Sequence, residues 1–305
     1  MLNQLEQLPS DGADLKTGNP LAITSRIKSI KVALDFINKI HGAMLDNAGL
    51  DVNVLDPLCN PPEEQGDISN PNVCLSLDLF LAVTNASEEI YNLCHSAILH
   101  CYSSTNILLY YLVKKLVSEI TGVIAVYDDM CINSCHAFMG PFSQHNSCTI
   151  CGEAQYNMVQ LASTDKKVPC QQFCMILLSP QLQALCQSHT GATNMWYLDQ
   201  KLKDVMKMLE NLQMDNGSNI IYNNILCGSE AQDLADRVAI TAYDTLVLCS
   251  LDGAQLYQNM KSDTWLSIWV IHNFSLDSRY QKQHVFPGTI IPGPNKLKIT
   301  DSYLY

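Results

Sequence analysis

The sequence predicts an α+β protein in which a mostly helical N-terminal region precedes a cysteine-rich module and a group of strands. Apolar residues recur at helical spacing over much of the first 122 residues, two close cysteine pairs lie between residues 131 and 151, and three strand-like apolar runs follow residue 243. Helical periodicity in one part of a chain and extended apolar runs in another are typical of this class.

The composition is that of a globular protein. The chain has 305 residues, of which 47% are hydrophobic and 16% charged, enough for two domains or for one domain with a helical extension. A net charge of −12 disfavours nonspecific nucleic-acid binding over the whole surface, although a local basic groove remains open. We expect no membrane span, because no apolar run approaches the required length, and no secretory signal.

The thirteen cysteines therefore indicate a reducing compartment. In such a compartment cysteines are buried small residues, catalytic groups or metal ligands rather than disulfides. Their spacing has to decide among these roles.

Residues 1–122 form the first predicted region. Residues 1–21 show no periodicity and are expected to be loose, and a helix is predicted from Thr24 onward. Its apolar residues recur every three or four positions, which predicts a packing helix in a bundle or an oligomerisation helix. These residues are Ile27, Ile30, Leu34, Ile37, Ile40 and Met44.

The rest of this region is predicted to be a linker and two helices. The stretch from Leu50 to Val73 is rich in proline, acidic residues and asparagine, so we expect a flexible linker. One helix is predicted over Leu75–Leu99. A second follows the capping residues Ser103–Thr105 and ends at Gly122.

Two cysteine pairs predict a zinc knuckle within residues 123–157. Cys131 and Cys135 form a C-x₃-C pair, and Cys148 and Cys151 form a C-x₂-C pair twelve residues later. Each short turn brings two sulfurs to about 2.3 Å from one Zn²⁺, and Gly152 supplies the small residue that such a turn needs. A four-sulfur site has no open coordination position, so its expected role is structural.

Three alternatives to this ligand set stay open. The four cysteines can instead be buried free thiols, and His136 or His145 lies close enough in sequence to replace one of them. Cys170 and Cys174 form another close pair, but their apolar surroundings favour a buried or half-buried strand.

Residues 158–235 are predicted to be a helical connector. Ser179 and Pro180 form a favourable helix start. A longer helix is predicted over Thr193–Met214, with an apolar stripe and lysines mostly outside it.

The last region, 236–305, begins with a strand that carries Asp252. The run Leu246–Leu251 is almost entirely apolar, which predicts a strand covered on both faces. Two further runs, Trp265–Ile271 and Val285–Ile291, complete a predicted antiparallel meander. Asp252 is then either a turn residue or a metal ligand.

A meander whose first strand presents an aspartate is how ribonuclease-H-like nucleases and transposases begin. In that chemistry two divalent ions, Mg²⁺ or Mn²⁺, are clamped by carboxylates and stabilise an in-line phosphodiester displacement. Hard oxygen ligands suit such ions, so an aspartate is the expected residue type.

Several segments together resemble the CACTA (En/Spm-like) DNA transposases of fungal type. The C-terminal matches contain an S-x-D-G-like strand and an I-P-G-P segment about forty residues later, and the cysteine module and a following helical segment are also similar. The resemblance covers about Thr105–Tyr305. The segments are Ser250–Tyr257, Lys261–Trp265, Ile291–Lys296, Tyr127–Phe138, Cys148–Glu153 and Pro180–Leu185.

The resemblance implies a ribonuclease-H-like catalytic domain that cuts and joins transposon-end DNA in the nucleus, with Asp252 as the first of three acidic ligands. In the family the other two acids follow the I-P-G-P segment, and Asp263 and Asp301 match neither. We therefore expect this chain by itself to be catalytically incomplete.

Alternative functions are also predicted. The first is a noncatalytic, zinc-bearing remnant that binds DNA or a protein, and the second is an unrelated zinc-bearing scaffold. A homo-oligomer is a further expectation, and without the resemblance the expected location is cytoplasmic.

Overall fold

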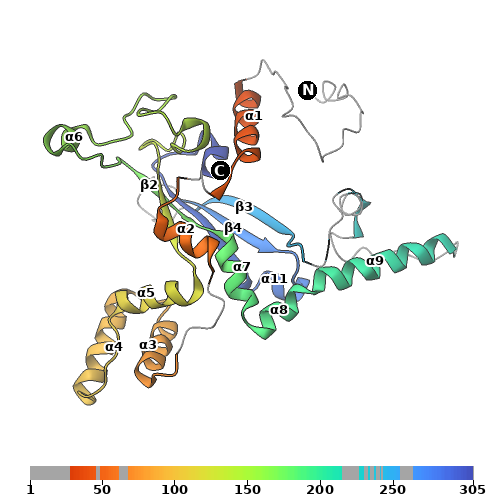
Figure 1. Cartoon of the computed structure of the whole chain (residues 1–305), viewed down its shortest axis with the longest axis horizontal. Helices are drawn as coiled ribbons and strands as arrows, with labels where there is room; N and C mark the ends of the chain where they lie inside the picture. Colours follow the sequence, from red (N-terminus) through yellow and green to blue (C-terminus); the bar gives the residue numbers. More distant parts are fainter. Residues whose placement is uncertain are drawn as a thin grey trace.

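The structure is a computed structural model that describes residues 28–45, 49–61, 68–214, 227–229, 233, 237, 241, 243–254 and 264–304. It is an α+β protein with one five-stranded antiparallel sheet and helices that pack against it or extend away from it (Figure 1). The predicted α+β class is therefore confirmed. The predicted loose N-terminal residues 1–21 lie outside the described residues.

Among the described residues, ten segments are α-helical. They are α1 (Lys28–His41), α2 (Val52–Cys59), α3 (Pro71–Ala82), α4 (Glu88–Cys101), α5 (Tyr110–Thr121), α6 (Met158–Thr164), α7 (Leu178–Cys186), α8 (His189–Met195), α9 (Tyr197–Met214) and α11 (Leu276–Arg279). Three short 3₁₀ helices are η2 (Gly140–Phe142), η4 (Lys282–His284) and η5 (Thr300–Tyr303).

Local capping explains several helix boundaries. The Asn70 side chain accepts a hydrogen bond from the Asn72 amide at the start of α3, and Pro71 occupies the first helical position. The predicted stop at Gly122 is confirmed, because this residue ends α5 with φ +66°. These residues set where α3 begins and where α5 ends.

Two predictions for the N-terminal region, a flexible linker and a single helix, were wrong. The stretch expected to be a flexible linker contains α2, whose N-terminus is capped by the Asp51 carboxylate. The single helix expected over Leu75–Leu99 is divided into α3 and α4 by a turn at residues 83–87, where the Ala86 amide donates to the Val83 carbonyl. Asparagine and serine favour such a turn, but a turn this short leaves the spacing of the apolar residues undisturbed, so the sequence pattern does not reveal it.

The sheet joins strands from distant parts of the chain. Its order is β1-β2-β5-β4-β3, and every neighbouring pair is antiparallel. The predicted meander of the last three strands and the predicted strand at Cys174 are both confirmed. The strands are β1 (Ala125–Asp129), β2 (Gln172–Ile176), β3 (Val247–Ala254), β4 (Thr264–Ile271) and β5 (Val285–Pro292).

The strand that carries Asp252 differs from its prediction. The sequence predicts a strand covered on both faces, but β3 is at one edge of the sheet and most of its residues are half-exposed or exposed. Leu248 and Cys249, which belong to the apolar run, are exposed to solvent rather than buried in a core. An apolar run identifies a strand, but the position of that strand in the sheet depends on residues far away.

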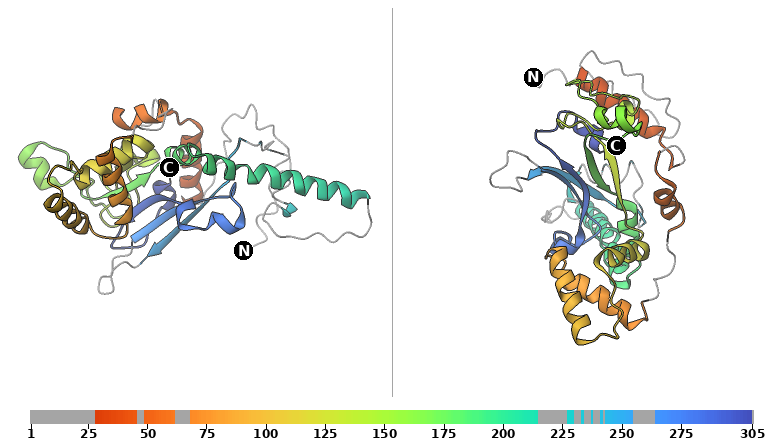
Figure 2. Two further views of the ribbon diagram at one scale, coloured as in Figure 1. Left: turned by 90° about the horizontal axis from the view of Figure 1, so that it is seen from below. Right: turned by 90° about the vertical axis from the view of Figure 1, so that its left-hand side faces the viewer.

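One face of the sheet packs against the main hydrophobic core. This core contains residues from β1, β2 and β5, the cysteine-rich loops and the C-terminal segment, and α2 packs on it through Val54 (Figures 1 and 2). The buried residues are Val126, Met130, Ala137, Phe173, Met175, Ile291 and Tyr303. The core therefore brings the C-terminal segment next to the cysteine-rich loops.

Candidate metal centre

The four predicted cysteine ligands come from two consecutive loops. Cys131 and Cys135 lie in the loop that follows β1, which is closed by a bridge between Met130 and Ala137. Cys148 and Cys151 lie in the next loop, which Ser147 and Ala154 close in the same way. Both loops are tight hairpins, so each cysteine pair is held on one turn.

Backbone conformation turns each loop around its sulfurs. Ser134 has φ +56° and Gly152 has φ +80°, both in the left-handed region. In the same loops, the Asn133 amide donates to Cys131 Sγ and the Ile150 amide donates to Cys148 Sγ, each at 3.4 Å. The sequence-based role of Gly152 as a turn residue is consistent with this geometry.

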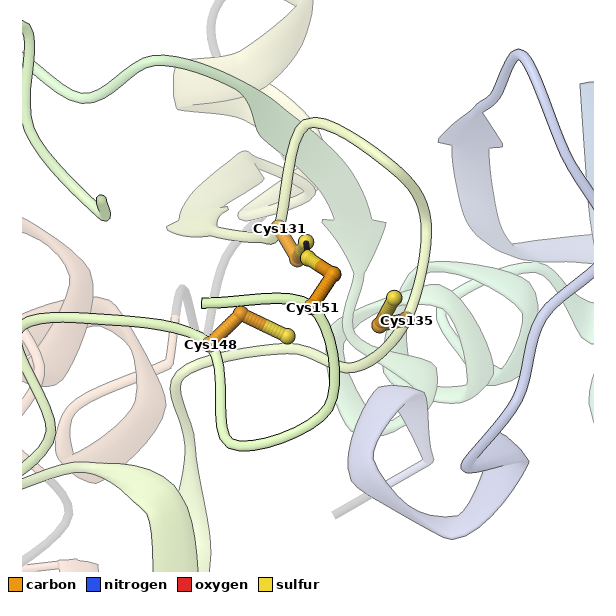
Figure 3. Close-up of side chains that lie close together, drawn as sticks. All are labelled: Cys131, Cys135, Cys148 and Cys151. Atoms are coloured by element: carbon orange, nitrogen blue, oxygen red, sulfur yellow. Dashed lines mark hydrogen bonds between the residues drawn. The ribbon is translucent and has the colours of Figure 1, made fainter. Parts of the chain in front are cut away.

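The four sulfurs converge on one small space (Figure 3). All four Sγ atoms lie within 4.8 Å of one another, and those of Cys131 and Cys151 are 3.4 Å apart. In a tetrahedral zinc site with Zn–S bonds of about 2.3 Å, the sulfurs are about 3.8 Å apart. The four cysteines can therefore hold one metal ion such as zinc with only small side-chain shifts.

The pKa shifts differ between the buried and the exposed cysteines of the cluster. Burial opposes ionisation of Cys151, but hydrogen bonds from the Glu153 backbone and the Cys131 and Asn133 side chains lower the pKa of its thiol to about 6. Burial raises the pKa of the Cys131 thiol. Cys151, at the exposed edge of the cluster, is therefore the cysteine whose thiolate is most favoured, and the thiolate is the form that binds metal.

Two buried hydroxyls beside the cluster have no hydrogen-bond partner. They are Ser134 Oγ, in the first cysteine loop, and Tyr303 Oη, from η5. Burial raises the pKa of the Tyr303 hydroxyl, and the charges of three cluster cysteines raise it further, so this hydroxyl lies near the sulfurs. Buried hydroxyls without partners are costly, and the thiolate sulfurs of a metal-bound cluster would be acceptors for them.

The C-terminal segment also holds the first loop in place. The Ile299 amide donates to the Cys135 carbonyl at 3.0 Å, and the Ala137 amide donates to Ser302 Oγ at 2.9 Å. The Lys298 side chain lies close enough to Cys135 to lower the pKa of that thiol, although burial has the larger, opposite effect. A cation here would partly balance the charge of four thiolates.

Neither histidine alternative joins the four sulfurs. His136 is fully buried, its Nδ1 lies 2.9 Å from the Ala137 carbonyl, and its Nε2 accepts from the Thr149 amide. Both ring nitrogens are therefore engaged, and burial lowers the pKa of this imidazole. His145 is exposed, and its ring and that of Phe142 form a T-shaped contact with centroids 6.0 Å apart.

Asp252 has no comparable group of potential metal ligands around it among the described residues. Its carboxylate is exposed on the edge strand β3 and accepts a hydrogen bond from the adjacent Gly253 amide at 2.8 Å. Within the described part of the chain, it belongs to no group of three or more potential metal-ligating side chains. Asp263 lies outside the described residues, and Asp301 is in η5 beside the cysteine loops.

Several residues around the cluster were not found from the sequence. Tyr303, Ser302 and Lys298 approach the cysteines from about 150 residues away, and no spacing rule connects them. Ser134 lies inside the cysteine motif, but only its left-handed backbone and buried hydroxyl distinguish it.

Comparison with known proteins adds no assignment. No protein-family model, no curated protein and no solved structure matches this chain significantly. Across the described segments, no helix combines the length and apolarity that a membrane crossing requires.

Proposed function

We propose that this chain is a noncatalytic, zinc-stabilised binding protein of transposase lineage. The observation that carries the proposal is the convergence of four cysteine sulfurs within 4.8 Å, at the junction of the sheet and the C-terminal segment. A site with four sulfur ligands is closed and has no position for substrate or water, so its role is to stabilise the fold.

The chain's own residues explain how such a centre would act. Bound zinc would supply four metal–sulfur bonds that cross-link the two loops. The first loop is already tied to the C-terminal segment through Ile299 and Ser302. The buried hydroxyls of Ser134 and Tyr303 would donate toward the thiolates, and Lys298 would offset their charge. The metal thereby stabilises the region where the sheet, α1 and the C-terminus meet.

The lineage rests on the sequence resemblance to CACTA transposases. In that interpretation, β3, β4 and β5 are the opening strands of a ribonuclease-H-like domain, the ancestral partner is transposon-end DNA, and the location is the nucleus. The antiparallel meander with Asp252 on its first strand is compatible with this origin.

A second candidate is metal-dependent DNA cleavage by the chain itself. Its support is the solvent-exposed Asp252 carboxylate, which is free to reach a hydrated Mg²⁺ or Mn²⁺ ion. Two-metal chemistry needs further carboxylates within a few ångströms, and among the described residues Asp252 belongs to no such group. We therefore favour the noncatalytic function.

The test uses the purified full chain, its Asp252→Asn variant and supercoiled plasmid DNA. We expect about one zinc per chain and no nicking in Mg²⁺ or Mn²⁺. Nicking that requires the metal and disappears in Asp252→Asn would overturn the noncatalytic assignment. Protein free of zinc, with all four thiols titrating in the native state, would overturn the zinc-stabilised assignment.

A further inference from the structure

The described helices leave most of the sheet face opposite the core uncovered, and only near the end of β4 is a residue of that face, Val270, almost fully buried. Cross-strand partners share a face, and the register aligns one row of side chains across all five strands. Figure 2 (right) shows the helices gathered on the other side of the sheet and beyond its end. The row is Tyr127, Cys174, Ile290, Leu266 and Asp252.

This open face exposes large apolar side chains. Tyr127, Leu248, Ile268 and Ile290 are 62%, 47%, 37% and 40% exposed, and the register places all four on this face. The next residues along the strands, such as Phe173 and Ile291, point to the opposite side and are almost fully buried. A contiguous apolar face of this kind marks an interaction surface.

The charge of the sheet restricts what can cover this face. The five strands contain three aspartates and no lysine, arginine or histidine. Asp129 and Asp252 stand on the open face at opposite edges of the sheet. A suitable partner is therefore an amphipathic helix with an apolar stripe and basic flanks.

Helix α1 has these properties and is itself incompletely covered. Phe36 anchors it, because this side chain is 3% exposed and packs on Phe142 with ring centroids 5.7 Å apart. The predicted apolar stripe is nevertheless largely in solvent, with Ile30, Ile37 and Ile40 exposed by 43%, 47% and 54%. The structure thus buries Phe36, beside the stripe, and leaves Ile30, Ile37 and Ile40 exposed.

The charge of α1 matches the open face. Its sequence contains three lysines and one aspartate, a net charge of +2 with His41 neutral. Helix α4 also exposes apolar residues, Ile90 and Leu93, but it carries two glutamates and no lysine. Electrostatic attraction to an acidic sheet therefore favours α1 over α4.

The dimensions also agree. Fourteen helical residues extend about 21 Å. Five strands spaced about 4.8 Å apart span about 19 Å. A helix of this length covers the sheet from edge to edge, as helices do on sheets within domains.

We propose that two copies of this chain associate reciprocally, with the exposed stripe of α1 from each copy lying on the open sheet face of the other. This inference goes beyond the proposed function, since neither surface contains a zinc ligand. It gives a partner to both apolar surfaces at once, and the two contacts are equivalent under a twofold axis.

The test combines two double variants of the full chain. Ile37→Glu with Ile40→Glu alters only α1, and Ile268→Lys with Ile290→Lys alters only the sheet face. Sedimentation velocity over a concentration series should show a dimer for the wild type. Each double variant should dimerise at least about tenfold more weakly. Val159→Lys, at an exposed position in α6, is the matched control and should remain dimeric.

Mixing the two double variants gives the decisive result. Each retains the surface that the other has lost, so one of the two contacts can form, and we expect a mixed dimer to reappear. A wild-type monomer at all concentrations would overturn the proposal. A sheet variant that remains fully dimeric would show that α1 pairs with α1 instead. Zinc content and circular dichroism of the same samples report separately on folding and on the metal centre.

Discussion

The cysteine cluster and the Asp252 strand show how differently two polar sites can be supported by one fold. Three of the four cysteines are buried, the backbone donates to their sulfurs, and a segment about 150 residues away holds the loop. Asp252 lies on an exposed edge strand and is bonded to its neighbour's amide. The comparison indicates that the described part of the fold brings four potential metal ligands together at the cysteines, whereas it brings no such group together at Asp252.

The largest effect is expected from removing a buried ligand. Cys135→Ser should abolish stoichiometric zinc binding and lower the free energy of unfolding by more than about 3 kcal/mol, because metal binding is coupled to folding. Zinc analysis and denaturant unfolding measure both quantities. Cys101→Ser, at an exposed position outside the cluster, is the control and should change neither. Equal behaviour of the two variants would contradict a structural metal.

Tyr303 tests whether the surroundings of the cluster matter. Tyr303→Phe removes the buried hydroxyl while keeping the ring, so we expect a loss of about 1–2 kcal/mol and faster zinc loss to a chelator. Tyr280→Phe, on an exposed tyrosine, should behave like the wild type. Stabilisation by Tyr303→Phe would mean that the hydroxyl is not used by the metal-bound state.

The stability of the region that follows β4 should decrease in acid because of His272. His272 is buried, Arg279 Nη1 lies 2.6 Å from its Nδ1, and burial together with the Arg279 charge lowers the pKa of the imidazole. The folded state therefore binds a proton less readily than the unfolded state, whose histidine pKa is about 6.5. Stability from this pair is complete above that value and decreases as the pH falls below it.

This prediction is measured by urea unfolding at pH 8 and pH 5.5. Acid also protonates zinc-bound thiolates, so the informative quantity is the difference between the wild type and His272→Gln, which keeps an acceptor but does not titrate. The wild type should lose about 1 kcal/mol more than the variant over this range. Parallel curves would show that the histidine does not contribute.

The smallest effect is expected at Asp252. Asp252→Asn should change the unfolding free energy by less than about 0.5 kcal/mol and leave zinc content unchanged, because the carboxylate is exposed. Chemical denaturation of matched samples checks this. A large loss of stability would reveal a structural role for Asp252 that its contacts do not indicate.

The sequence predicted what depends on local pattern. The spacing of Cys131, Cys135, Cys148 and Cys151 was sufficient to propose one site, because each pair lies on a single turn. The strands β3, β4 and β5 followed from apolar runs with short connections. The turn between α3 and α4 was missed because a short polar interruption does not disturb apolar periodicity.

Long-range arrangement was not predictable in the same way. The edge position of β3, and hence the exposure of Asp252, depends on β1 and β2 adding to β5 at the other side of the sheet. The approach of Tyr303 to the cysteines depends on the core that both share. Likewise, the apolar stripe of α1 was found from its spacing, but the sequence could not indicate that Phe36 is buried while Ile30, Ile37 and Ile40 are exposed.

X-ray absorption at the zinc edge of the purified full chain tests the central claim most directly. The account predicts one zinc per chain with four sulfur neighbours at about 2.3 Å and no nitrogen or oxygen neighbour. Protein that contains no zinc, or zinc with a nitrogen or oxygen ligand in place of a sulfur, would contradict a closed four-cysteine centre.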